Sequence, residues 1–223
     1  MRFEDTSVYN IYNAILGARN PMNSWNKSDS VFKGYNGTIE NTVIGENDLK
    51  LLQSLIKAGS EHRKFMRQIG VSVIITAPLY WWKEFDTYKV GTVSNSTSTM
   101  HKLASTPITK ECFEMDDFEN FMSEKTLMGN DINNEGIWFI LINYLEWLRQ
   151  KYNETKDKRY WKELIRLLPE SYLQKRTITM NYENLLSMVK QRRNHKLIEW
   201  SVAFILWAKS LPYADKLIFI GEE

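Results

Sequence analysis

The 223-residue chain has one cysteine, Cys112, and three histidines, His62, His101 and His195. A single thiol cannot form a disulfide within the chain, and it supplies too few thiolates for a structural zinc or iron–sulfur site. A multi-histidine metal centre would need all three histidines. We therefore expect no metal site and no disulfide framework, and a reducing compartment.

Long hydrophobic runs and a strong net charge are also missing. The longest apolar run, residues 70–82, is shorter than the roughly 20 residues of a membrane helix and contains Pro78. The N-terminus becomes polar at Glu4, so no secretory signal is expected. Lys plus Arg number 29 against 27 Asp plus Glu, a balance of +2 that falls short of a strongly basic nucleic-acid-binding domain. We expect a cytoplasmic protein without membrane or nucleic-acid partners.

Common nucleotide and zinc motifs are absent as well. The chain has no P-loop, no GxGxxG and no HExxH, so it does not use these devices to bind phosphates or zinc. The composition is that of a folded globular protein, with 43% hydrophobic and 25% charged residues. Its 8 Trp, 11 Tyr and 10 Phe can fill a core or stack on flat ligands. Composition leaves both uses open.

Hydrophobic spacing predicts one α+β domain over residues 1–223, because no repeat or composition shift marks a boundary. Residues 19–45 are expected to form a long irregular connection, and such loops often bind ligands. Helices are expected over 7–18, 47–59, 79–88, 117–127, 133–152, 156–167 and 182–208, and strands over 65–76 and 173–180.

Two polar clusters are candidate binding sites. The hydroxyl-rich run 92–99 could donate hydrogen bonds to anionic oxygens, particularly if it opens a helix, or it could be a solvated loop. In the predicted C-terminal helix, Arg192, His195 and Glu199 are three and four residues apart and hence on one face. That face is either the wall of a ligand site or solvated surface.

The order of several motifs resembles the flavin-dependent thymidylate synthases (ThyX). The resemblance covers about residues 47–200, and it implies a ThyX-like α+β domain with an antiparallel or mixed sheet, flanking helices and a long C-terminal helix. It also implies a homotetramer with active sites at subunit interfaces. The motifs are Gly-Ser-Glu-His at 59–62, the segment 76–85, the hydroxyl run, Leu168-Pro169, Asn181 and the segment 192–199.

The family's signature, Arg-His-Arg-x-x-Ser-x-Asn-Glu-x-Ser-x-Arg, falls on residues 87–99, where hydroxyl side chains persist and most of the positive charge is lost. Glu84 stands where the family has a glutamine. By position, the resemblance implies cofactor contacts from His62, Thr87, Tyr88, Lys89, Asn181 and His195. It implies substrate contacts from Glu84, Asn95, Thr97, Ser98, Thr99 and Arg166.

The implied activity is methylation of a pyrimidine nucleotide at C5, dUMP to dTMP, with FAD as cofactor and NADPH and methylenetetrahydrofolate as co-substrates. Arg192 matches an arginine that contacts the uracil ring, and a one-residue deletion before His195 makes Arg193 the other candidate. A guanidinium on the ring edge stabilises an anionic ring, so no attacking cysteine is needed. Two alternatives stay open: UMP methylation or hydroxymethylation, and a non-catalytic protein of this fold that binds a nucleotide or nucleic acid.

Overall fold

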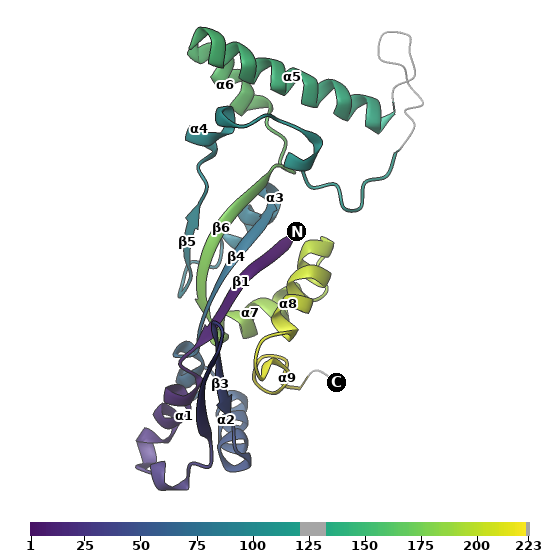
Figure 1. Ribbon diagram of the computed structural model, residues 1–223. Coiled ribbons are helices and arrows are strands. Elements are labelled where there is room, and N and C mark those ends of the chain that lie inside the picture. The colour runs from purple at the N-terminus through teal and green to yellow at the C-terminus, as the bar shows by residue number, and fades with distance from the viewer. Residues whose placement is uncertain (121–132, 222–223) are drawn as a thin grey trace. The chain divides into compact units, whose positions relative to one another are not determined.

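The computed structural model describes residues 1–120 and 133–221 (Figure 1). In this part of the chain, six strands form one mixed sheet in the order β2-β3-β1-β4-β6-β5. β1 runs parallel to β3 and antiparallel to β4, and β2 and β3 are antiparallel. The strands are β1 (Arg2–Tyr9), β2 (Val31–Asn36), β3 (Ile39–Val43), β4 (Gly70–Pro78), β5 (Val93–Ser96) and β6 (Leu173–Asn181). The expected α+β fold with a mixed sheet and flanking helices is confirmed.

Most of the helices lie close to their expected positions. Gly59, with φ 112°, follows the last residue of α2, as expected for a helix stop. The α-helices are α1 (Ile11–Arg19), α2 (Glu46–Ala58), α3 (Leu79–Phe85), α4 (Thr99–Lys102), α5 (Asn134–Thr155), α6 (Lys158–Leu167), α7 (Tyr182–Arg192), α8 (Ile205–Lys209) and α9 (Ala214–Leu217). Of the helix expected over 117–127, residues 117–120 are not helical, and the rest lies outside the described residues.

The chain divides into two compact units. The first contains residues 1–76, 83–95 and the segment from 176 onward, and the second contains 77–82 and the described residues of 96–175. In the second unit, α5 and α6 lie side by side (Figure 1) and bury Leu145, Leu148 and Leu164. The expectation of a single domain stays a prediction.

The N-terminal expectations need two corrections. The helix expected over 7–18 begins only at Ile11, because Ser7, Val8 and Tyr9 pair with β4. Asn10 separates strand from helix with a left-handed backbone, φ 70°. The strand expected over 65–76 begins at Gly70, because residues 64–67 form a 3₁₀ turn.

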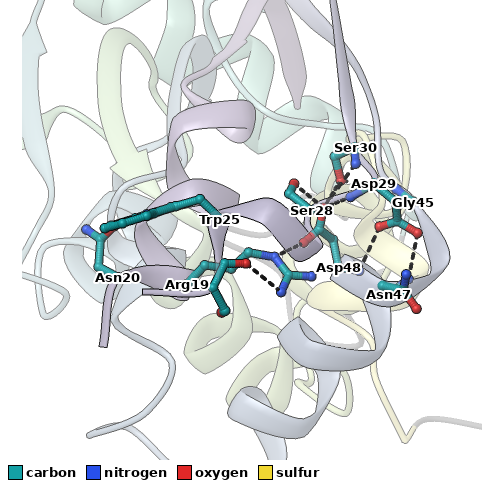
Figure 2. A network of polar contacts seen from close by, with 10 residues as sticks. Arg19, Asn20, Trp25, Ser28, Asp29, Ser30, Gly45, Asn47 and Asp48 are labelled. Atoms are coloured by element: carbon teal, nitrogen blue, oxygen red, sulfur yellow. Dashed lines mark hydrogen bonds and ion pairs between the residues drawn. The ribbon is translucent and has the colours of Figure 1, made fainter. Parts of the chain in front are cut away.

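Residues 19–45 are irregular only in their first part, where 20–30 consist of two 3₁₀ turns and coil. They contain the β2–β3 hairpin, and the segment before it is fastened by the buried Asp48 (Figure 2). Asp48 Oδ1 accepts a hydrogen bond from Arg19 Nε at 2.6 Å, and Oδ2 accepts from the hydroxyls of Ser28 and Ser30 at 2.7 and 2.6 Å. Burial opposes ionisation of Asp48, but hydrogen bonds from Ser30, Ser28 and Arg19 outweigh it and hold the pKa of Asp48 below its ordinary value. This carboxylate joins α1, α2 and the start of the hairpin.

The helix expected over 182–208 is broken. α7 ends at Arg192, a π-helix covers Glu199–Phe204, and α8 follows. In the break, the backbone N–H of Leu197 donates to His195 Nδ1 at 3.2 Å. Arg192, His195 and Glu199 therefore do not lie on one regular helical face.

Candidate functional site

The candidate site is centred on Arg192, the last residue of α7. Its Nη1 lies 2.5 Å from Oε2 of Glu84, which belongs to α3. Its Nε donates to the hydroxyl oxygen of Tyr88, in the loop after α3, at 2.8 Å. Arg192 Nη2 has no hydrogen-bond partner among the described residues, so it is available to a ligand.

Two aromatic rings flank the guanidinium. Arg192 Cζ lies 5.4 Å from the ring centre of Tyr88 and 4.8 Å from that of Trp200. Trp200 is fully buried, whereas the Arg192 side chain keeps 16% exposure. Cation–π attraction and the two polar contacts restrict the orientation of the guanidinium while one edge remains accessible.

His195 shares the carboxylate with Arg192. Its Nε2 lies 3.1 Å from Glu84 Oε2. Its Nδ1 accepts a hydrogen bond from the Leu197 N–H, so each ring nitrogen of His195 lies beside a polar group of the chain. The Glu84 carboxylate thus lies beside both the Arg192 guanidinium and the His195 ring. We call Glu84, Tyr88, Arg192, His195 and Trp200 the Arg192 cluster.

The start of α7 holds the loop that carries Tyr88. Asn181 and Asn184 form a reciprocal capping box, in which each side-chain oxygen accepts from the other residue's backbone N–H. Asn184 Nδ2 also donates to the Val90 carbonyl at 2.8 Å. Gly91 has φ +78°, and a Cβ added there would lie 3.0 Å from Asn184 Oδ1. Glycine thus permits the close approach of this loop to α7.

The expected cofactor residues have different surroundings. The Thr87 hydroxyl donates to the Glu84 carbonyl at 2.7 Å. Lys89 and Tyr88 line a pocket of about 280 Å³ with Phe85, Asp86, Thr92 and Ser94. Asn181 caps α7, His62 is exposed in the turn after α2, and His195 belongs to the Arg192 cluster.

Most of the expected substrate residues lie outside the first unit. Glu84 belongs to the Arg192 cluster, and Asn95 is exposed in β5. In the second unit, Ser98 caps the four-residue α4, Thr97 N–H donates to the Lys175 carbonyl at 2.9 Å, and Arg166 pairs with Glu163 at 2.9 Å. Thr99 is the first residue of α4. The hydroxyl run 92–99 is thus divided between strand β5 and a short helix.

The structure distinguishes the two candidate arginines. Arg192 makes the contacts with Glu84 and Tyr88, whereas Arg193 follows α7 and its backbone N–H bonds to the Val189 carbonyl at 3.1 Å. Sequence reasoning missed Trp200 and also Gln191, whose Oε1 accepts from the Tyr88 hydroxyl at 2.9 Å. The sequence signal that could have identified them was their position, because Gln191 and Trp200 flank the polar segment 192–199.

Across residues 1–120 and 133–221, no three His, Cys, Asp or Glu side chains gather in a group suited to a metal ion. Nor does any helix in these ranges have the length and apolar character needed to cross a membrane.

No protein-family model matches the chain, and no curated protein is similar to it in sequence. Two crystal structures of flavin-dependent thymidylate synthase ThyX from Helicobacter pylori, each with FAD and dUMP, are similar in fold, with TM-scores of 0.68 and 0.69. In both comparisons the identity is 16%, and the match covers 99% of this chain and 98% of the other. The chain therefore has the fold of the flavin-dependent thymidylate synthase ThyX.

Proposed function

We propose that this chain is a flavin-dependent enzyme that methylates a pyrimidine nucleotide at C5, with dUMP to dTMP as the reaction. The observation that carries the proposal is the match over nearly the whole chain to ThyX bound to FAD and dUMP. Methylenetetrahydrofolate and NADPH are the proposed co-substrates.

The Arg192 cluster supports a role in binding the pyrimidine ring. Arg192 Nη2 can donate a hydrogen bond, and Glu84 Oε1 can accept one, since both of the described polar contacts of this carboxylate fall on Oε2. A donor beside an acceptor is complementary to the N–H and C=O edge of uracil. The guanidinium also stabilises the negative charge that the ring carries when C5 acts as a nucleophile. The Glu84 carboxylate beside the guanidinium would repel a phosphate at this position, which favours the ring edge instead.

The residues after α3 fit part of a flavin dinucleotide. Lys89 supplies a positive charge for phosphate, and Ser94 and Asn95 offer exposed hydrogen-bonding side chains. FAD, when bound and reduced by NADPH, would supply the hydride that completes the methyl group. The pocket of about 280 Å³ is smaller than the roughly 300–1,000 Å³ of typical small-molecule sites. We therefore include the homotetramer in the proposal, with a second subunit completing the site.

The test is the visible spectrum of the purified protein before and after addition of FAD, followed by thermal unfolding with dUMP. We expect a flavin spectrum and a melting temperature that rises with dUMP, because a ligand that binds only the folded state stabilises it. Arg192→Lys should reduce the dUMP shift, because lysine lacks the planar fork, whereas the matched Arg193→Lys should keep it. A colourless protein with no response to FAD or dUMP would overturn the proposal.

The second candidate is nucleotide binding without flavin chemistry. The observation that favours it is that the hydroxyls of Thr87, Tyr88 and Thr92 all bond within the chain. Stabilisation by dUMP in a protein that never binds FAD would support this candidate. Stabilisation by UMP but not dUMP would instead support methylation or hydroxymethylation of UMP.

A further inference from the structure

A second pocket, of about 480 Å³, lies in the first unit between the start of α1 and the β2–β3 hairpin. Four of its lining residues are aromatic, Tyr9, Tyr12, Phe32 and Tyr35, and one is the carboxylate Glu40. The pocket contains no residue of the Arg192 cluster, so it is independent of the proposed methylation site.

A β-bulge builds one wall of this pocket. Phe32 pairs with Thr42 and Tyr35 pairs with Glu40, and the register shifts between these pairs, where Gly34 has φ +89°. Residues three apart in a regular strand face opposite sides of the sheet. Thr42 and Glu40 are two apart and both buried, so the bulge brings Phe32 and Tyr35 to the same face.

The aromatic rings enclose a space rather than fill a core. Tyr12 and Phe32 have ring centres 6.1 Å apart at 42°, and Phe32 and Tyr35 are 6.0 Å apart at 77°. A Cβ added to Gly70 would lie 2.3 Å from the Tyr9 ring, so this glycine allows the ring to lie close to the strand. Phe32 is 46% exposed and Tyr35 57%. Exposure of two large rings to water costs free energy, and a ligand bound against them would offset that cost.

Glu40 contributes the one formal charge among the described residues that line the pocket. Glu40 is buried, and its oxygens accept hydrogen bonds from the backbone N–H groups of Ile11 and Tyr12 at 2.9 and 2.8 Å and from the Thr42 hydroxyl at 2.5 Å. Aromatic faces add the negative end of their quadrupoles. Among the described residues that line the pocket there is no lysine or arginine, so a phosphate would lack a counter-charge.

We propose that this pocket binds an organic cation, specifically an alkylated ammonium group. Aromatic faces attract such a cation from several directions, and the Glu40 carboxylate adds charge at close range. The rings stand at 42° and 77° to each other, which suits a compact, rounded group. A flat heterocycle would instead be favoured by two parallel faces.

The test is a titration of the full-length protein with tetramethylammonium chloride, with the neutral analogue tert-butanol as the matched ligand. Binding is measured by calorimetry and by NMR of the ligand methyl groups. We expect saturable binding of tetramethylammonium, clearly tighter than that of tert-butanol. Equal binding of the two would show a purely apolar pocket, and no saturable binding of either would show that the pocket is not a cation site; both results would overturn the proposal.

Two variants locate the binding. Tyr35→Ala should weaken tetramethylammonium binding roughly tenfold, because one ring of the cage is lost. Val31→Ala is the matched control, since Val31 is 52% exposed on the same strand but does not line the pocket. Circular dichroism and the melting temperature confirm that each variant folds, and Phe32→Leu repeats the test at a second ring. Unchanged affinity in both ring variants would contradict the assignment.

Discussion

Glu84 links the other polar members of the Arg192 cluster, because Arg192 and His195 both contact its Oε2. The carboxylate balances the guanidinium and lies beside any nucleotide bound to Arg192. It therefore sets how strongly the site attracts an anion, while its second oxygen can still accept from a ring N–H.

We expect Glu84→Gln to strengthen dUMP binding by roughly threefold to tenfold, because the substitution removes one negative charge from the cluster. Binding of deoxyuridine, which has no phosphate, should change little. Calorimetric titration of both ligands at two salt concentrations checks this, and the gain for dUMP should shrink at high salt. Equal effects on the two ligands would contradict the electrostatic explanation.

Asp48, buried near the start of α2, is expected to contribute strongly to the stability of the first unit. Asp48→Asn leaves Arg19, which is only 5% exposed, without its ion partner, and breaking a buried pair in this way costs about 3–5 kcal/mol. Urea unfolding measures the loss. Glu46→Gln is the control in the same helix, because the Glu46 side chain is 88% exposed and its ion pair contributes little.

At the scale of elements, Asn181 stands at the start of α7, where it is a candidate both for a flavin contact and for a helix cap. The resemblance to ThyX suggests a flavin contact, and the structure shows a helix cap that also faces Gly91. We expect Asn181→Ala to lower the free energy of unfolding by about 1 kcal/mol, and Asn181→Ser, which retains a capping oxygen, to lose much less. If both variants lose flavin equally while keeping stability, the cofactor role is the correct one.

α5 is fastened to the preceding segment through Glu146. This carboxylate accepts from Arg149 Nε at 2.7 Å and from the Ile108 N–H at 2.8 Å. The hydrogen bond from Arg149, followed by those from Ile108 and Gln150, outweighs partial burial and lowers the pKa of Glu146 to about 2.

Because the folded-state pKa lies below the unfolded value, the contribution of Glu146 to stability is present above about pH 4.5 and is lost as the pH falls toward 2. Glu146→Gln should therefore flatten the loss of stability over this interval. Thermal unfolding across the pH range tests it, with Glu154→Gln as control, since Glu154 is 59% exposed. An identical pH dependence in wild type and Glu146→Gln would contradict the assignment.

Sequence patterns predicted those elements that depend on residues close together in the chain. The apolar stripe of α5 and the glycine stop of α2 are such cases. The β2–β3 hairpin was missed because its strands are short and mostly exposed, and its attachment depends on Asp48, which is remote in the sequence. The break after Arg192 was missed because neither glycine nor proline marks it and apolar residues resume at Leu197, although residues 190–196 are all polar.

At the scale of the whole molecule, the fold could be predicted from the sequence more completely than the contacts of the candidate site. The order of motifs indicated the ThyX fold, which the comparison over nearly the whole chain supports. The contacts among Glu84, Tyr88 and Arg192 join segments more than a hundred residues apart, so spacing alone could not predict them. The altered residues 87–89 leave flavin chemistry as the central claim to test.

The most direct measurement is mass spectrometry of dUMP incubated with the protein, FAD, NADPH and methylenetetrahydrofolate, with Arg192→Lys and Arg193→Lys in parallel. The account predicts that dUMP gains the mass of one CH₂ unit with the wild-type protein and Arg193→Lys, and that Arg192→Lys loses at least tenfold in rate. Unchanged dUMP in the presence of protein that has bound FAD would contradict it.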